Sequence, residues 1–132
     1  MSGFKEKYGM NVAVIGASPD RERYSNKAVR AFMMQGFKVF PVNPNETEIE
    51  GLKSYPSVAD ISDRVDFVSV YLRASISLST KIPEQLHSKN VKAAIINPGS
   101  ESDLLIEELT GYDIEPLMIC SIRSLGYDPS EL

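Results

Sequence analysis

The chain contains few of the side chains that usually build redox, metal and disulfide chemistry. Its 132 residues include one cysteine, one histidine and no tryptophan. Cys120 has no second cysteine, so it cannot form an intramolecular disulfide, and a cysteine-rich zinc site is excluded. His87 falls in a polar stretch, where we expect it on a helix surface. No Ser-His-Asp set and no metal-ligand cluster can be placed, and we therefore predict no catalytic and no metal-binding residue.

An excess of basic residues and a long apolar run are also missing. The net charge of −4 argues against broad attachment to nucleic acid or to an anionic membrane. Neither a membrane-spanning stretch nor an N-terminal signal pattern occurs, so we expect a cytoplasmic protein. A chain of 132 residues with 42% hydrophobic residues can supply one core, and we predict a single domain over residues 1–132.

Short apolar runs alternate along the chain with segments of helical pattern. This alternation is typical of βαβ units, and it predicts an α/β domain with a mostly parallel five-stranded sheet between two layers of helices. The expected strands are residues 12–15, 38–42, 65–71, 92–96 and 115–119.

Local signals place the helices between these strands. Ser25 is the expected N-cap of a first helix that Gly36 closes, and the Met33-Met34 pair near its end is expected to fill gaps in the core. Residues 45–61 are expected to form a long connection with one short helix near 57–61.

Two further helices are expected later in the chain. Residues 75–90 have a helical pattern, and Pro83 either kinks this helix or begins a second short one. Residues 102–111 form a clearer helix, with Ser102 near its start and Gly111 at its end.

The segment of residues 11–19 is the most informative motif. Its apolar run ends at Gly16 and small polar residues, as the first strand and turn of a nucleotide-binding α/β domain do. Gly16 lets the backbone turn tightly or approach a ligand, and the N–H groups of the turn and the following helix could hold a phosphate. Any buried strand before a helix also needs a small turn residue, so the motif is a hypothesis.

The motif differs from the glycine-rich fingerprint of NAD-binding domains. Ser18 and Arg21 stand where the second and third glycines are expected. The second predicted strand ends at Asn43, whereas NAD binding requires an acidic side chain there that bonds the ribose hydroxyls. NAD is therefore disfavoured as the ligand.

Several loops are expected to meet at the carboxyl edge of the sheet, where open α/β folds bind ligands. They are residues 16–25, 43–45, 71–75 and 97–100. Arg21, Arg23 and Lys27 lie near the start of the first helix and could reinforce phosphate binding, although such charges are often only solvated. Tyr71 could flank an adenine or a pantetheine group, or pack against the core.

Taken in order, these motifs resemble the small standalone CoA-binding proteins with a Rossmann-like domain. The resemblance covers nearly the whole chain and rests on residues 14–19, 36–44, 55–61 with Gly51, and 65–71, together with the Asn97-Pro98-Gly99 turn and Cys120. The domain is similar to the CoA-binding part of the succinyl-CoA synthetase α subunit. The resemblance implies a Rossmann-like three-layer fold, with coenzyme A or an acyl-CoA lying across the carboxyl edge of the sheet.

The resemblance also implies which residues contact the ligand. The phosphates would be contacted by Gly16, Ala17, Ser18 and Pro19, assisted by Arg23, Ser25 and Lys27; the adenosine side would be lined by Asn43 and Pro44, and the remaining cleft by Tyr71, Arg73, Asn97 and Pro98. The chain lacks the phosphohistidine segment and the ATP-binding partner subunit of the synthetase, so CoA binding is implied more strongly than ligation. We expect Cys120 to be buried rather than to form a mixed disulfide with CoA.

The expected function is a noncatalytic module that binds or senses CoA or an acyl-CoA. Its expected partner is this small molecule, and the sequence is compatible with a homodimer. Two alternatives stay open: an enzyme, as a partner-dependent CoA ligase or acyltransfer component or an NAD(P)-binding oxidoreductase, and an interaction domain that keeps the fold without the ligand. Fold analogy does not separate these functions.

Overall fold

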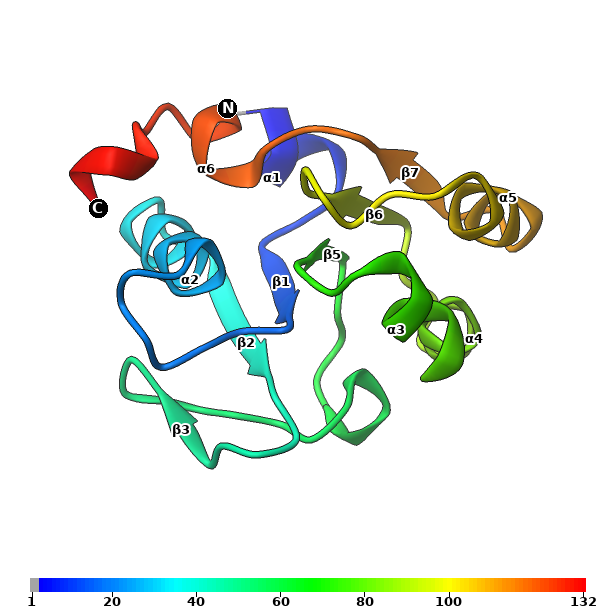
Figure 1. The fold of residues 1–132 in the computed structure, drawn as a ribbon, viewed down its shortest axis with the longest axis horizontal. Helices are drawn as coiled ribbons and strands as arrows, with labels where there is room; N and C mark the ends of the chain where they lie inside the picture. Colours follow the sequence, from blue (N-terminus) through cyan, green and yellow to red (C-terminus); the bar gives the residue numbers. More distant parts are fainter. Residues whose placement is uncertain (1–2) are drawn as a thin grey trace.

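The computed structural model describes residues 3–132 and contains a parallel sheet of five strands with helices on both faces (Figure 1). The strands are β1 (Asn11–Ile15), β2 (Lys38–Val42), β5 (Phe67–Val70), β6 (Ala93–Ile96) and β7 (Glu115–Leu117). Their order is β2-β1-β5-β6-β7, and each neighbouring pair is parallel. The predicted α/β, Rossmann-like fold is confirmed. The strand order reverses between β1 and β5, and such a point is where open α/β sheets bind ligands.

Helices cover both faces of the sheet. One face carries α1 (Gly3–Lys7), α2 (Tyr24–Met34) and α6 (Ser121–Ser124); the other carries α3 (Ala74–Ser79), α4 (Ile82–Ser88), α5 (Asp103–Gly111) and the 3-10 helix η1 (Val58–Asp60). A second 3-10 helix, η2 (Pro129–Glu131), follows α6. Among residues 3–132, no helix is both long and apolar enough to cross a membrane.

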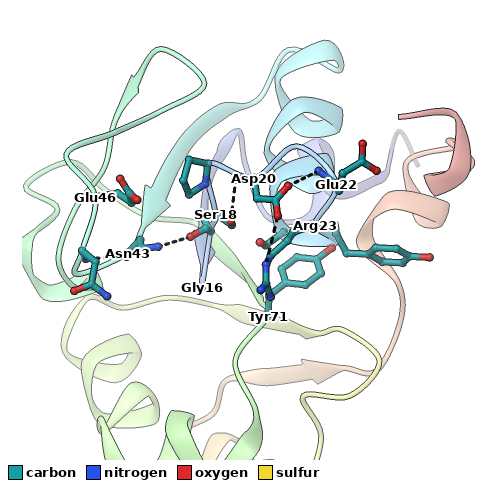
Figure 2. Close-up of a pocket in the computed structure, with 13 residues that line it drawn as sticks. Gly16, Ser18, Asp20, Glu22, Arg23, Asn43, Glu46 and Tyr71 are labelled. Carbon is teal, nitrogen blue, oxygen red and sulfur yellow. Dashed lines mark hydrogen bonds and ion pairs between the residues drawn. The ribbon is translucent and has the colours of Figure 1, made fainter.

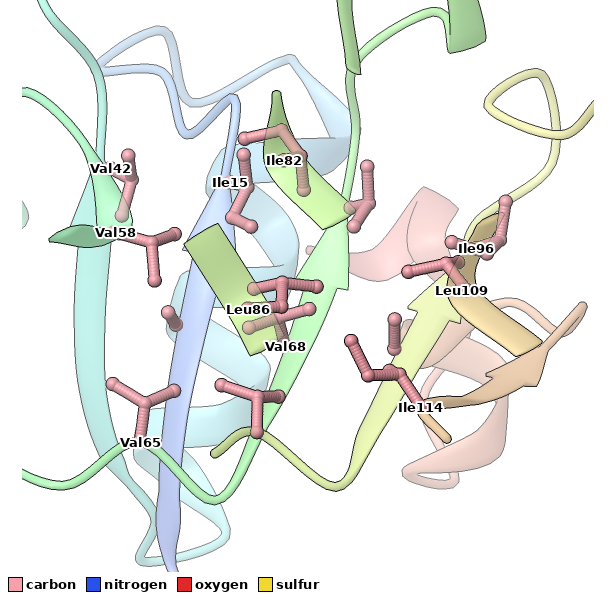
Figure 3. Packing of buried hydrophobic residues seen from close by; sticks show 14 of the residues in the cluster. Ile15, Val42, Val58, Val65, Val68, Ile82, Leu86, Ile96, Leu109 and Ile114 are labelled. Atoms are coloured by element: carbon pink, nitrogen blue, oxygen red, sulfur yellow. The ribbon is translucent and has the colours of Figure 1, made fainter. Parts of the chain in front are cut away.

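The strand side chains alternate between two hydrophobic cores. In β1, Val12 and Val14 belong to the core under α2, whereas Ala13 and Ile15 belong to the core under α3, α4 and α5. Figure 3 shows this second core, in which strand side chains meet Leu86 of α4. Because both faces are covered, the strands are apolar along nearly their whole length, which is the pattern that made them recognisable.

The start of α2 differs from the prediction. Arg23 occupies the N-cap position with extended backbone (φ −79°, ψ 143°), and the helix begins at Tyr24. The prediction of Ser25 as the N-cap is therefore wrong, because Ser25 already lies buried in the first turn. The predicted end is correct: Gly36 follows the helix at φ +82°.

The prediction that Met33 and Met34 fill the core is also wrong. Their exposed fractions are 40% and 54%. The buried stripe of α2 passes through Ala28, Val29 and Phe32. At 3.6 residues per turn, Met34 falls on the side of the helix opposite this stripe and Met33 falls at its flank, so neither enters the core.

Two connections clarify what the sequence left open. Pro83 begins a separate helix, α4, rather than kinking a longer one.

The short helix expected near 57–61 is η1, but the connection also contains an unpredicted hairpin of β3 (Glu48–Ile49) and β4 (Leu52–Lys53). Strands of two residues are too short to show an alternating pattern. Glu50 and Gly51 at the tip have φ +52° and +77°, as tight two-residue hairpin turns require.

Tyr8 lies in the core next to α1, and its hydroxyl donates a hydrogen bond to the Glu115 carboxylate. Burial, this hydrogen bond and the charge of Glu115 raise the pKa of Tyr8 from 10.0 to about 12. Folding therefore favours the protonated phenol, and this contribution to stability is present below pH 10 and is lost as the pH rises through 12. We expect the stability difference between wild type and Tyr8→Phe, measured by urea unfolding, to shrink over that range. A difference that stays constant with pH would contradict the assignment.

Candidate functional site

The turn after β1 joins three strand ends at the carboxyl edge of the sheet. Gly16 adopts φ +85°, a conformation that side chains of L-residues rarely take. The N–H groups of Gly16 and Ala17 both donate to the Val42 carbonyl, at 3.1 and 3.2 Å, and so attach the turn to β2. A Cβ on Gly16 would lie 3.0 Å from Leu72 Cδ2, which places the turn against the loop after β5.

The N-terminus of α2 follows this turn and is open. Arg23 makes no side-chain capping bond, and within residues 3–132 no group accepts the N–H of Tyr24, Ser25 or Asn26. Unpaired N–H groups at the positive end of a helix dipole favour an anion such as a phosphate. The site therefore has backbone donors for an anion, although they belong to the helix end rather than to Gly16 and Ala17.

A polar cavity of about 760 Å³ opens beside this helix end (Figure 2). It is lined by Gly16, Ala17, Ser18, Pro19, Asp20, Glu22, Arg23, Tyr24, Ser25, Asn43, Asn45, Glu46 and Tyr71. Among these lining residues, Arg23 is the cation, and its guanidinium lies 4.0 Å from the Asp20 carboxylate. Arg23 is exposed, so it can turn toward a ligand at little cost.

A second cavity, of about 370 Å³, adjoins the first across the ends of β1 and β2. The two cavities share Gly16, Asn43 and Asn45. The walls of the second cavity are mainly apolar and include Pro44, Pro56, Leu72, Ile76 and Ile82. Together the two cavities offer a polar and an apolar compartment on either side of one glycine turn.

Asn43 connects the loops rather than presenting free polar atoms. Its Nδ2 donates to the Ala17 carbonyl at 2.8 Å, and its Oδ1 accepts the N–H of Asn45 at 2.8 Å. The residue that replaces the acidic side chain of NAD-binding domains is thus engaged on both sides. The end of β2 therefore carries an amide that holds the loops together in place of the carboxylate of NAD-binding domains.

Tyr71 forms the wall of the polar cavity beyond the end of β5. Its hydroxyl is buried, and no group among residues 3–132 lies in hydrogen-bonding geometry with it. Burial raises the pKa of Tyr71 well above its usual value, the Cys120 thiol raises it further, and the nearby Ser69 and Ser121 hydroxyls counteract the rise. The phenol therefore stays protonated at neutral pH. Cys120 itself is half-buried, so the expectation of burial is met only in part.

Nine of the predicted site residues line the two cavities. They are Gly16, Ala17, Ser18, Pro19, Arg23, Ser25, Asn43 and Tyr71 in the polar cavity, and Pro44 in the apolar one. Lys27 does not line either, because it is buried and donates to the Pro129 carbonyl at 2.7 Å. Arg73 occupies the exposed N-cap position of α3, and Pro98 is exposed in the turn after β6.

Asn97 is also outside the two cavities and is 1% exposed. Its Nδ2 donates to Ser69 Oγ at 2.9 Å and to the Val70 carbonyl at 3.0 Å. Its Oδ1 accepts the N–H of Ser121 at 2.9 Å. The side chain therefore holds the start of α6 against β5. His87 is exposed as expected, and its ring stacks on Tyr112 with centroids 4.6 Å apart.

Two features of the site were missed by the sequence prediction. Leu72 lies in the loop before α3 and Ile76 lies within α3, so helical periodicity does not mark the apolar wall that they form. Asn26, which donates to the Ser18 carbonyl and to Glu50, has no local signal because these partners lie 8 and 24 residues away.

The fold defines a Rossmann-like α/β domain, with an open helix N-terminus and two cavities at the carboxyl edge of its sheet. Residues 10–124 match the model of a protein family described as CoA binding domain. The chain belongs to this CoA-binding domain family, and the resemblance inferred from its sequence is confirmed.

Known proteins with similar sequence or structure include enzymes much longer than this chain. An acetate-CoA ligase (ADP-forming) II of Archaeoglobus fulgidus is 38% identical over 94 residues, which are 67% of this chain and 13% of that protein. A hypothetical protein from Pyrococcus horikoshii OT3 aligns with TM-score 0.82 and 27% identity, over 92% of this chain and 84% of that one.

A further solved structure is the dinucleotide forming acetyl-coenzyme A synthetase 1 of Ca. Korarchaeum cryptofilum. It aligns with TM-score 0.74 and 26% identity, over 86% of this chain and 27% of that one. The chain spans less than a fifth of the length of the curated acetate-CoA ligases that it matches.

Proposed function

We propose that the chain binds coenzyme A or an acyl-CoA at the carboxyl edge of its sheet, as a noncatalytic binding or sensing module. The observation that carries this proposal is the open N-terminus of α2 beside the Gly16 turn, with a polar cavity on one side and an apolar cavity on the other. Membership of the CoA-binding domain family supports the same ligand.

The two cavities fit the two chemical halves of such a ligand. The diphosphate would lie at the N–H groups of Tyr24 and Ser25, where backbone donors and the helix dipole compensate its charge. The adenine would lie in the apolar cavity between Pro44 and Leu72, because a flat base buries apolar surface there.

The pantetheine arm would then leave the polar cavity along Tyr71. The protonated Tyr71 hydroxyl has no partner among the described residues, so it could donate to an amide of the arm after a small side-chain movement. Arg23 would turn from Asp20 to the phosphates.

A partner-dependent component of a CoA ligase or acyltransferase is the second candidate. Its support is the similarity to acetate-CoA ligases, of which this chain corresponds to a small part. An NAD-binding oxidoreductase is disfavoured, because Asn43 replaces the acidic side chain and its amide is already engaged.

Calorimetric titration of ligand-stripped protein tests the proposal. We expect saturable one-site binding of CoA and no binding of NAD. Acetyl-CoA incubated with the protein alone should release no free thiol above the buffer rate. Binding of NAD without CoA would overturn the proposed ligand, and thiol release dependent on the protein would overturn the noncatalytic role.

A further inference from the structure

The loop between β1 and α2 is held by hydrogen bonds within it and by side chains from α2 and from the β3–β4 hairpin. Within the loop, Asp20 N–H donates to Ser18 Oγ and Glu22 N–H donates to Asp20 Oδ1, each at 3.0 Å. From α2, the fully buried Asn26 donates through Nδ2 to the Ser18 carbonyl at 3.0 Å. The backbone of the phosphate-facing loop is therefore attached to the helix through one buried amide.

The same amide is bound from the opposite side by Glu50 at the tip of the β3–β4 hairpin. Glu50 Oε2 accepts Asn26 Nδ2 at 3.0 Å, and Glu50 Oε1 pairs with the guanidinium of Arg21 in the loop. The side chain of Glu50 is 17% exposed and Arg21 is 61% exposed, so the contact with the buried Asn26 is the more shielded of the two. Hydrogen bonds from Asn26 and Arg21 lower the pKa of Glu50 despite its partial burial, which keeps it charged.

Arg30 completes the arrangement from the next turn of α2. Its Nε donates to Asn26 Oδ1 at 2.7 Å, and its Nη2 donates to the Arg21 carbonyl at 2.9 Å. Both amide atoms of Asn26 are thus occupied, and the loop backbone is held at Ser18 and at Arg21. Neither Glu50 nor Asn26 is among the residues that line the polar cavity.

We propose that Glu50 is a positioning residue for the ligand, acting through Asn26 and Arg21 to hold the 18–23 loop in the conformation that leaves the N-terminus of α2 open to the diphosphate. This inference rests on the proposed function. A hairpin with two-residue strands has little stability alone, so its tip gains a defined position from these contacts while it fixes the loop. Without Glu50, the ligand has to order the loop on binding, and this ordering lowers its affinity.

The test compares Glu50→Ala with Glu48→Ala. Glu48 is exposed in the same hairpin and makes no hydrogen bond or ion pair with residues 18–23, so it is a matched control. Loss of a charged hydrogen-bond acceptor is expected to weaken CoA binding about tenfold in Glu50→Ala, with no change in Glu48→Ala. Adenosine lacks the diphosphate, so its weak binding, followed by NMR line broadening, should be equal in both variants.

Hydrogen exchange and a double-mutant cycle separate positioning from general damage. Amides of residues 18–23 should exchange faster in ligand-free Glu50→Ala and not in Glu48→Ala. Arg21→Gln combined with Glu50→Ala should weaken CoA binding by less than the product of the two single effects, because both act through one contact. The milder Glu50→Gln keeps an acceptor for Asn26 and is expected to lose about threefold.

The outcomes distinguish the positioning role of Glu50 from the proposed function. Wild-type affinity for CoA in Glu50→Ala, an equal loss of CoA and adenosine, or independent effects of Arg21 and Glu50 would overturn the positioning role. Unchanged exchange in residues 18–23 would overturn it whether or not CoA binds. A wild-type chain that binds no CoA, with faster exchange in Glu50→Ala, would overturn the proposed function and leave the loop attachment supported.

Discussion

Gly16→Val is expected to lower the affinity for CoA by at least about 100-fold, which corresponds to a loss of roughly 2.7 kcal/mol of binding free energy. At φ +85°, a β-branched residue is strained by about 1–3 kcal/mol. Its Cβ would lie 3.0 Å from Leu72 Cδ2 and 3.3 Å from the Tyr71 carbonyl carbon. Leu72 and Tyr71 are walls of the two cavities, so any movement that relieves the contact changes both.

The domain should remain folded in this variant. A loss of about 2–3 kcal/mol is smaller than the roughly 5–15 kcal/mol by which most domains are stable. The matched control is Gly126→Val, because Gly126 has φ +92° but no atom within 4 Å of its added Cβ and lies outside the cavities. Calorimetry should show near wild-type CoA affinity for Gly126→Val. Wild-type affinity in Gly16→Val would contradict the role of the turn.

Asn97→Ala is expected to destabilise the domain by about 2–4 kcal/mol, which is the cost of leaving buried polar groups without partners. The substitution removes the Nδ2 group that donates to Ser69 Oγ and to the Val70 carbonyl. It also removes the Oδ1 atom that accepts the N–H of Ser121. With the side chain 1% exposed, water cannot replace these bonds without rearrangement. Urea unfolding measures the loss, and CoA affinity of the folded fraction should change less than about threefold.

Two variants separate this structural role from a ligand contact. Asn97→Asp keeps the acceptor for Ser121 but places a buried carboxylate against the Val70 carbonyl, so at neutral pH its stability should fall at least as far as that of Asn97→Ala. Asn45→Ala removes an exposed amide from the cavity walls and should leave the unfolding curve unchanged. If Asn97→Ala kept full stability but lost CoA, the contact implied by the family resemblance would replace the structural role.

The strands and the glycine turn were predictable because their signals are local. A strand covered on both faces is mostly apolar, and β1, β2, β5 and β6 show this in their own few residues, whereas the edge strand β7 is only partly buried. Pro83 could only kink a helix or begin one, so the sequence reduced its role to two possibilities. The β3–β4 hairpin was missed because its strands are shorter than any periodic pattern.

The roles of individual polar residues were less predictable, because they depend on partners far away in the chain. Lys27 and Arg23 stand four residues apart and look equivalent in sequence, yet Lys27 bonds Pro129 while Arg23 faces the cavity. The separation of Lys27 from Pro129 is 102 residues, and no local pattern encodes such a pair.

By itself, the sequence determined the α/β fold, the position of the Gly16 turn and the family, since each follows from hydrophobic periodicity and from short-range turn residues. Only the tertiary structure decided that the helix end rather than Gly16 and Ala17 offers free N–H groups, that Asn97 is internal, and that Glu50 reaches the loop. The physical reason is that hydrogen-bond satisfaction is a property of the packed chain, in which each donor takes whichever acceptor folding brings within about 3 Å.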